Sequence, residues 1–420
     1  MELLDEREVR ANLQKQVTED FPYPLAVIKA NLPGTDKRSL ISAVAVCEGY
    51  FQLKNKGVRH MFMSYSCEGL IFYLSIDRDI RELKKICVDI ETSHPLGRLM
   101  DIDVMDTRGQ ISRRELNLSP RKCFLCDEDA HLCVRNQTHT PDDIDRYILS
   151  VFRKYLVADD LATRWQRLFF TALIGELIKP RGYGCVTMSD DGSHTDMDAM
   201  LFIESANTIS HLMCKAYAYP DDFQKLRDIG RIAEQKMFET TGNINTHKGA
   251  IFLMLLVMAG LQRENPVAHI ARLCQNILAD FDKAQSSHGM TLYYKYGITG
   301  IRGLAKEGFR ELFEIYYPFY LKHSCDETFL KIICENPDTT LMHRGGIPLY
   351  NECREKAKSI TNQQDRFAFD AWMKSQRLSP GGSADMLSAL ILMDCFMWIK
   401  EEIEDEPTDK NRHRRYLRIE

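Results

Sequence analysis

The stretch 241–249, TGNINTHKG, places polar, cationic and glycine residues in front of the apolar run AIFLMLLVMAGL. Such a run predicts a buried helix. Free backbone N–H groups in the first turn of a helix can bind phosphate oxygens, and Lys248 would add a positive charge. Asn243 and Asn245 would add neutral donors. The stretch is either an anion site or a polar loop that caps a core helix.

A second candidate site lies in the first half, where two carboxylates alternate with apolar residues in LMDIDV. On a strand this spacing puts Asp101 and Asp103 on one face. Two acids placed in this way are a common means of holding Mg²⁺ during phosphoryl or nucleotidyl transfer, and Arg98, Arg113 and Arg114 would meet a polyphosphate. The alternative is a half-exposed edge strand followed by an Arg-Gly turn.

The segment RKCFLCDEDAHLCVRNQTHT holds thiols and an imidazole at the spacing of metal ligands. Cys123 and Cys126 form C-x-x-C, Cys133 follows seven residues later, and His139 six residues after that. Thiolate and imidazole groups are ligands of tetrahedral Zn²⁺. The second pair is closer than in most zinc ribbons and fingers. Two interpretations stay open, a structural zinc knuckle or a reduced Cys-rich turn whose basic residues matter more than its sulfurs.

Five polar segments interrupt the second half of the chain. They read DDGSHTDMDAMLF, TGNINTHKG, GITGIRGLAKEGF, NPDTTLMHRGG and SPGGSADMLSALILM. In the first of them His194 and Asp198 stand four residues apart, which on a helix gives them a common face. Each segment combines glycine with a charged residue at the edge of an apolar helix. One shared cleft, with acids for Mg²⁺ and cations for phosphate, explains five such segments more simply than five separate loops.

Composition restricts the class of protein. A chain of 420 residues with 44% hydrophobic and 27% charged residues predicts two or three domains with sizeable cores. The net charge of -5 argues against a general nucleic-acid binder. The first twenty residues lack an apolar signal core, and the longest apolar run is shorter than the ~20 residues of a membrane span. We therefore expect a cytoplasmic protein with no membrane partner, in which most of the 13 cysteines are reduced thiols.

The coarse pattern of elements predicts two domains and a tail. Helices are expected at 1–20 and 80–92, and strands at 25–28, 61–76 and 99–104. From about residue 155 to 400 almost every segment has helical periodicity. We predict an N-terminal α+β domain (1–157), a C-terminal all-α helical domain (158–402) and a loose charged tail (403–420).

Residues 5–155 resemble the holo-acyl-carrier-protein synthase family of citrate lyase. The resemblance rests on NLPG with a following Lys, HPLGRLMDIDV, the GQISR of Gly109–Arg113, and the Cys-rich segment from Arg121 to His139. It implies transfer of a phosphoribosyl-dephospho-coenzyme A group from a triphosphate precursor to a Ser of the lyase's acyl-carrier (gamma) subunit, with release of pyrophosphate.

Residues 160–400 resemble the triphosphoribosyl-dephospho-coenzyme A synthase family. The five polar segments match its hallmarks in order, among them GSHTDMD, NTHKGAIF and GGSADML. The resemblance implies that ATP and 3′-dephospho-coenzyme A are joined and that adenine is expelled. One departure concerns KPRGYGCVT, where Thr187 replaces an Asp of the family pattern and Tyr183 a Pro. The missing Asp is either dispensable, or its role is taken over by Asp190 or Asp191.

Together the two resemblances imply a bifunctional enzyme, and the residue types suggest roles. In the second domain Asp196 and Asp198 would hold Mg²⁺ (or Mn²⁺), with Asp385 as a further ligand. Either His194 or His247 would act as acid or base. The remaining ATP- or dephospho-coenzyme A-binding candidates of this domain are Asn245, Lys248, Arg302, Glu307, His343, Arg344 and Ser383.

In the first domain Asp101 and Asp103 would hold Mg²⁺ while a carrier Ser oxygen attacks the α-phosphorus. Arg98, Arg113 and Arg121 would stabilise the charge of the phosphates. Two alternatives stay open. One is the same chemistry for the carrier subunit of malonate decarboxylase, and the other is a non-catalytic, zinc-stabilised nucleotide-binding protein.

Overall fold

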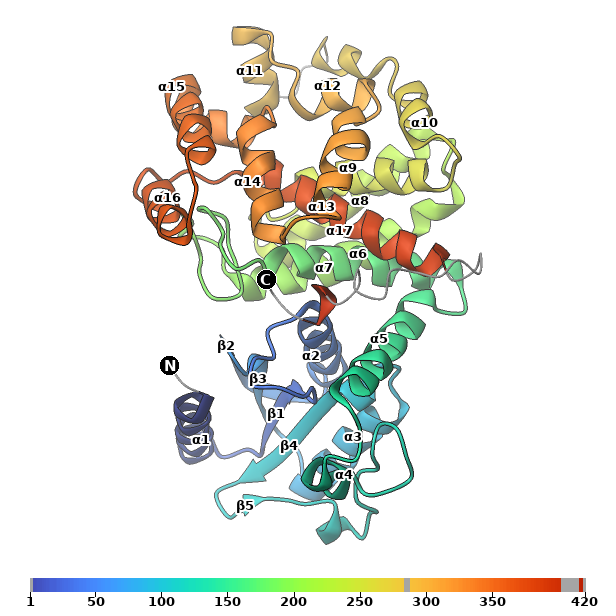
Figure 1. Ribbon diagram of the computed structural model, residues 1–420, viewed down its shortest axis with the longest axis vertical. Coiled ribbons are helices and arrows are strands. Elements are labelled where there is room, and N and C mark those ends of the chain that lie inside the picture. Colours follow the sequence, from blue (N-terminus) through green and yellow to red (C-terminus); the bar gives the residue numbers. More distant parts are fainter. Residues whose placement is uncertain (1–2, 283–287, 402–414, 418–420) are drawn as a thin grey trace. The chain divides into compact units, whose positions relative to one another are not determined.

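The computed structural model describes residues 3–282, 288–401 and 415–417 (Figure 1). The chain divides into two compact units. One comprises residues 1–157 together with a C-terminal segment that includes 415–417, and the other comprises residues 158–408.

The first unit combines helices with one sheet. Its elements are α1 (Leu3–Asp20), β1 (Leu25–Ala30), α2 (Leu40–Leu53), β2 (Val58–Ser66), β3 (Gly69–Ile76), α3 (Ile80–Ser93), η1 (Gly97–Leu99), β4 (Met100–Asp106), β5 (Gly109–Gln110), η2 (Arg114–Leu116), α4 (Ala130–Asn136) and α5 (Pro141–Val157).

The sheet is antiparallel, with the strand order β2-β3-β1-β4-β5. Side chains of β1 alternate between its two faces. Val27 packs in a buried cluster with Val17 of α1, whereas Ile28 meets Gly49 of α2. The register of β1 with β4 sets Lys29 opposite Asp101. This register decides which charged groups meet on the sheet.

Most sequence predictions for the first unit are confirmed. Helices form at the two expected places, and Asp101 and Asp103 share a face of β4. The stretch 61–76 is confirmed as strand-forming, and it is divided between two strands because the chain turns at Cys67 and Glu68 into the hairpin β2–β3. Gly69 has φ +80°, a conformation that glycine adopts without strain, and it starts the second strand.

The elements of the second unit in its described part are all helices, and a lone bridge between Thr187 and Asp190 is the only β-type pairing there. Its elements are α6 (Leu161–Leu177), α7 (Ala199–Met213), η3 (Cys214–Ala218), α8 (Phe223–Thr241), α9 (Lys248–Leu261), α10 (Pro266–Leu273), η4 (Ile277–Asp282), α11 (His288–Tyr296), α12 (Gly300–Lys306), η5 (Leu312–Tyr316), α13 (Tyr317–Tyr320), α14 (Cys325–Glu335), α15 (Thr339–Lys358), α16 (Gln363–Ser375) and α17 (Gly381–Glu401).

Helices α6, α9 and α17 form the centre of this unit, and α17 packs against both of the others. Helix α17 is long and apolar enough to cross a membrane by length and composition alone. Its most apolar window is 78% buried. Packing within a core therefore accounts for its hydropathy.

Two expectations for the second half need correction. The segment before Ala199 is a loop, so His194 and Asp198 do not share a helix face. Helix α7 starts late because the Asp198 carboxylate accepts the Leu201 N–H at 2.8 Å and caps the first turn. In the tail, Tyr416 is buried, which contradicts a wholly loose segment. Residues 402–414 and 418–420 of the predicted tail lie outside the described part.

Candidate active sites

The two strand carboxylates of the first unit share one cation, Lys29. Its Nζ lies 2.9 Å from Asp101 Oδ2 and also pairs with Asp103, which accepts a further hydrogen bond from Gln110 Nε2 at 2.5 Å. Burial acts to lower the pKa of Lys29, but the two carboxylates outweigh it and raise that pKa. Burial acts to raise the pKa of Asp101, but Lys29 and Arg121 outweigh it and lower that pKa. Lys29 and Asp101 are therefore both charged at neutral pH.

The three arginines expected to stabilise the charge of the phosphates, Arg98, Arg113 and Arg121, line one pocket of about 420 Å³. Arg114, also expected to meet a polyphosphate, is not among the residues that line it. Glu91 of α3 lies between two of them, 2.7 Å from Arg113 Nη2 and 2.6 Å from Arg121 Nη2. Its carboxylate is only 3% exposed. Arg121 also lies 3.5 Å from Asp101, so the pocket and the acid pair form one charged network.

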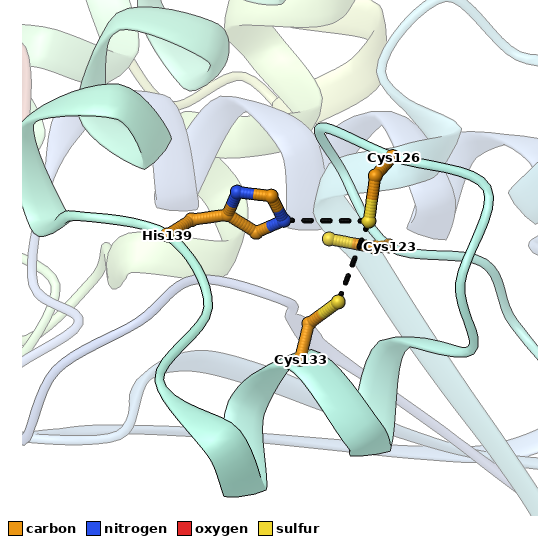
Figure 2. Close-up of side chains that lie close together, drawn as sticks. All are labelled: Cys123, Cys126, Cys133 and His139. Atoms are coloured by element: carbon orange, nitrogen blue, oxygen red, sulfur yellow. Dashed lines mark hydrogen bonds between the residues drawn. The ribbon is translucent and has the colours of Figure 1, made fainter.

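The cysteines and the histidine of the Cys-rich segment come together (Figure 2). Cys123 and Cys126 lie on a loop, Cys133 on α4 and His139 on the loop that follows. Their ligand atoms all lie within 4.8 Å of one another. Cys126 Sγ is 3.4 Å from both Cys133 Sγ and His139 Nε2. Among the described residues this is the only such group of three or more His, Cys, Asp or Glu side chains.

In the second unit, close contacts between helix starts join the polar segments. A Cβ on Gly249, at the start of α9, would overlap Asp385 Oδ2 on the first turn of α17. A Cβ on Gly300, at the start of α12, would lie 2.6 Å from the Cγ2 atom of Thr339 at the start of α15. Only glycine allows these helices to approach so closely.

His194 connects the first, fourth and fifth polar segments. Its Nδ1 accepts a hydrogen bond from Arg344 Nη2 at 3.0 Å, and its Nε2 lies 3.0 Å from Ser379 Oγ. A guanidinium only donates, so Nδ1 carries no proton and Nε2–H donates to Ser379. Burial, followed by the positive charge of Arg344, lowers the pKa of His194 to about 4. His194 is therefore neutral at pH 7, with both nitrogens engaged.

Two acidic side chains contact the N-terminal parts of α15, α17 and α9. Asp338 accepts hydrogen bonds from the first turn of α15 and, at 2.7 Å and 2.9 Å, from the backbone N–H and Oγ of Ser383. The Asp385 carboxylate lies against Gly249 at the start of α9. Burial, followed by the negative charge of Asp338, raises the pKa of Asp385 well above its ordinary value.

Side chains of the protein itself surround the start of α9. The Lys248 N–H donates to Asn245 Oδ1 at 3.2 Å, and the Asp385 carboxylate lies against Gly249. The Lys248 ammonium pairs with Glu234 of α8 at 2.5 Å. The geometry therefore favours the polar cap of a core helix over an open anion site.

His247 is packed inside the protein, where its contacts suit a structural role. Its ring is buried, meets Phe202 edge-on, and has Nδ1 2.8 Å from Ser205 Oγ. Burial lowers the pKa of His247 to about 3, so it is neutral at physiological pH. A buried neutral imidazole held in this way is poorly suited to proton transfer.

The three acids expected to hold Mg²⁺ in the second unit do not converge within the described structure. Asp196 is exposed, 3.8 Å from His194 Nδ1, while Asp198 caps α7 and Asp385 meets α9. The remaining candidates lie on α12 and its end (Arg302, Glu307) and on α15 (His343). Burial lowers the pKa of Arg302, whereas Glu307 and His343 are exposed.

The segment around Thr187, where the family pattern has an Asp, is held by local contacts. Thr187 is buried, and its N–H donates to the Asp190 carbonyl at 2.8 Å. The Asp190 carboxylate pairs with Lys374 at 2.5 Å. Asp191 is exposed, and burial together with Asp198 and Asp190 raises its pKa.

Sequence reasoning missed Lys29, Glu91 and the buried pair of Glu176 with Lys179. Each is a charged residue at a position where the pattern requires an apolar one. Lys29 interrupts LAVIKA, and Glu91 continues the buried spacing of Leu83 and Cys87 on α3. A charge on the buried face of an element was the available signal.

Comparison with protein families assigns each half of the chain. Residues 1–155 match the model of apo-citrate lyase phosphoribosyl-dephospho-CoA transferase. Residues 162–402 match the model of ATP:dephospho-CoA triphosphoribosyl transferase.

Two curated relatives span both halves, and a third covers about two thirds of the chain. "Protein CitXG" of Haemophilus influenzae is 28% identical and covers 94% of this chain and 95% of its own length. "Protein CitXG" of Leuconostoc mesenteroides subsp. cremoris is 26% identical and covers 94% and 96%. The 2-(5''-triphosphoribosyl)-3'-dephosphocoenzyme-A synthase of Haemophilus ducreyi is 31% identical and covers 64% of this chain and 98% of its own length.

Proposed function

We propose that this chain, which belongs to the ATP:dephospho-CoA triphosphoribosyl transferase family and also to the apo-citrate lyase phosphoribosyl-dephospho-CoA transferase family, makes the prosthetic group of citrate lyase and attaches it. It is a bifunctional transferase. The observation that carries this conclusion is the match of two family models to adjacent parts of one chain. Fusion suits the chemistry, because one half makes the substrate of the other and a tether raises its effective concentration.

The synthase half joins ATP to 3′-dephospho-coenzyme A. The 2′-hydroxyl oxygen of dephospho-coenzyme A bonds to C1′ of the ATP ribose, the bond from C1′ to adenine breaks, and adenine leaves with the proton. The triphosphate stays on the transferred ribose. We place this reaction where α9, α15 and α17 begin, because the polar segments meet there. An adjacent carboxylate would stabilise the cationic character of C1′ in the transition state.

Two cationic residues near these helix starts, Arg302 and Arg344, are the proposed phosphate ligands of the synthase half. The Arg344 guanidinium is exposed and held by His194 and by the Arg377 carbonyl, so it is oriented before substrate binds. We assign His194 to positioning Arg344, because both imidazole nitrogens are engaged. Asp196, Asp198 and Asp385 remain candidates for the Mg²⁺ that accompanies ATP. In the described structure these three carboxylates do not lie together as ligands of one ion.

The transferase half moves the group to the carrier. A Ser oxygen of the citrate lyase acyl-carrier subunit bonds to the α-phosphorus, the bond to the β-phosphate oxygen breaks, and pyrophosphate leaves. Arg98, Arg113 and Arg121 would neutralise the phosphates in their pocket. The family description names citrate lyase, which favours its carrier over that of malonate decarboxylase.

The acid pair of the transferase half fits a divalent metal in donor type and spacing. Asp101 and Asp103 present carboxylate oxygens on one strand face, and these are ligands that Mg²⁺ and Mn²⁺ prefer. Lys29 stands between them, so its ammonium would have to move aside. When bound, the ion would supply positive charge to the phosphates.

The Cys-rich segment suits a softer ion. Three thiols and one imidazole are the donor set of structural zinc sites, so we propose Zn²⁺ for this group. Reduced thiols are consistent with a cytoplasmic location.

The first test is to incubate the purified chain with ATP, 3′-dephospho-coenzyme A and Mg²⁺ and to measure free adenine by chromatography. Adenine should appear only when both substrates are present. Adding apo carrier subunit should then give a mass increase on one Ser, together with pyrophosphate. No adenine and no label from a folded chain would refute the proposal.

A further inference from the structure

The segment 112–140 has almost no hydrophobic core of its own. Cys133 is the only buried residue within it. Four of its apolar side chains are exposed, namely Leu118, Leu125, Leu132 and Val134. Such a segment cannot be held by apolar burial, and small folds of this kind depend on a metal or another cross-link.

The backbone around the cysteines is nevertheless tightly turned. The Cys123 N–H donates to the Glu128 carbonyl at 2.8 Å, and the Ala130 N–H donates to the Arg121 carbonyl at 2.9 Å. The Leu125 N–H points to Cys123 Sγ at 3.5 Å. This turn aims the sulfurs of Cys123 and Cys126 at Cys133 and His139 (Figure 2).

The ligand spacing suits a tetrahedral ion. Zn²⁺ bound at about 2.3 Å to sulfur and about 2.0 Å to nitrogen holds its ligand atoms about 3.5–3.8 Å apart. The ligand atoms of this group lie within 4.8 Å, and two of the separations are 3.4 Å. Only small side-chain movements are needed to reach the coordinated geometry.

The same turn forms one wall of the arginine pocket. Residues 118–122, immediately before Cys123, line the pocket. Arg98 donates from Nη2 to the carbonyls of Lys122 and Cys123, at 2.6 Å and 3.1 Å, and stacks over the ring of Phe124. Arg121 reaches from this turn to Glu91. Two of the three pocket arginines are thus placed by the Cys-rich turn.

We infer that a zinc ion in the Cys123, Cys126, Cys133 and His139 site fixes this wall and thereby positions Arg98 and Arg121 for the triphosphate substrate. The inference rests on the proposed transferase function. Zinc then has a positioning role in one half of the enzyme. Carrier labelling depends on the ion, and adenine release does not.

The test compares Cys126→Ser with the matched control Cys67→Ser, since Cys67 is a free thiol of the same unit outside the group. Zinc is measured by elemental analysis, and Co²⁺ substitution by the absorption of thiolate-bound tetrahedral cobalt. We expect one zinc per chain in the wild type and in Cys67→Ser, and none in Cys126→Ser. Cys126→Ser should raise the KM of the triphosphoribosyl substrate at least tenfold and leave adenine release unchanged.

A rescue pair separates ligation from general damage. His139→Cys keeps four zinc ligands and should retain the ion and carrier labelling, whereas His139→Ala should lose both. Trypsin gives a readout that does not need activity, because chelation of zinc should expose Arg121 and Lys122 to cleavage. An absence of metal, a disulfide between Cys126 and Cys133, or unchanged trypsin protection without zinc would overturn the inference. A zinc-loaded, protected chain without either activity would instead contradict the proposed function.

Discussion

Arg344 donates a hydrogen bond to His194 Nδ1 at 3.0 Å, although the two residues stand 150 positions apart in the chain. After burial, the contact is the second cause of the lowered pKa of His194, and it also fixes the position of Arg344. Removing the guanidinium in Arg344→Ala should raise the pKa of His194 from about 4 towards its ordinary value, because one of the two causes of its lowering is lost. NMR titration of the imidazole protons measures this shift, and adenine release should fall at the same time.

The matched control for that variant is Arg310→Ala. Arg310 is exposed and pairs with Glu314 within its own segment. The Arg310→Ala variant should leave both the pKa of His194 and adenine release unchanged. An unaltered His194 pKa in Arg344→Ala would show that Arg344 does not lower the pKa of His194.

Lowering the pH should destabilise the second unit before its carboxylates become protonated. The folded pKa values of His194, about 4, and His247, about 3, lie below the ordinary value of a histidine. Between about pH 6.5 and 4 the unfolded chain therefore binds more protons than the folded one, so stability falls as pH falls through this window. Each histidine contributes at most about 1.4 kcal/mol per pH unit. Thermal melting at a series of pH values should show a shallower dependence for His247→Asn, and equal slopes would contradict the assignment.

Gly249→Ala should disable the synthase half selectively. The added methyl group would overlap Asp385 Oδ2, so α9 and α17 must separate at their starts. We expect a loss of about 2 kcal/mol in stability and a fall in adenine release. Carrier labelling from pre-formed triphosphoribosyl-dephospho-coenzyme A should persist. Gly289→Ala is the control, because its methyl group would have only an ordinary contact at 4.0 Å.

Asp101→Asn should disable the transferase half and leave the synthase half active. It removes one of the two carboxylates next to the arginine pocket, so carrier labelling should fall by about 10²-fold or more while adenine release stays normal. Intact-protein mass spectrometry of the carrier measures the labelling. Asp106→Asn is the control. Asp106 lies at the end of the same strand and forms an ion pair with Arg108, so this variant should have little effect on carrier labelling. Equal activity of the two variants would exclude Asp101 from the site.

Lys29→Met tests whether the ammonium holds the place of a metal ion. Without Lys29 the two carboxylates lose their shared cation, so the pKa of Asp101 should rise and the affinity for Mn²⁺ should increase. Electron paramagnetic resonance measures free Mn²⁺ during titration of the protein. Affinity that is unchanged in Lys29→Met, or already absent from the wild type, would argue that the pair is structural.

Local patterns predicted those parts of the site that depend on neighbouring residues. The alternation in LMDIDV placed Asp101 and Asp103 on one face, and the spacing of three cysteines and a histidine predicted the cluster of side chains that could bind a metal. Lys29 could not be placed against the acids, because its position depends on the register of β1 with β4, more than 70 residues away. His194 and Asp198 have helical spacing but lie in a loop, so periodicity over so short a segment misled the prediction.

The glycines that join the helix starts in the second unit restrict which mutations the synthase half can tolerate. At Gly249 and Gly300 the neighbouring atoms occupy the volume of any Cβ, so every substitution adds an atom where none fits. Amino-acid substitutions in this half must therefore accumulate on the outer faces of the helices, while the two glycines at the helix starts stay unchanged. In a saturation library selected for adenine release, these two codons should remain glycine when most exposed codons have diversified.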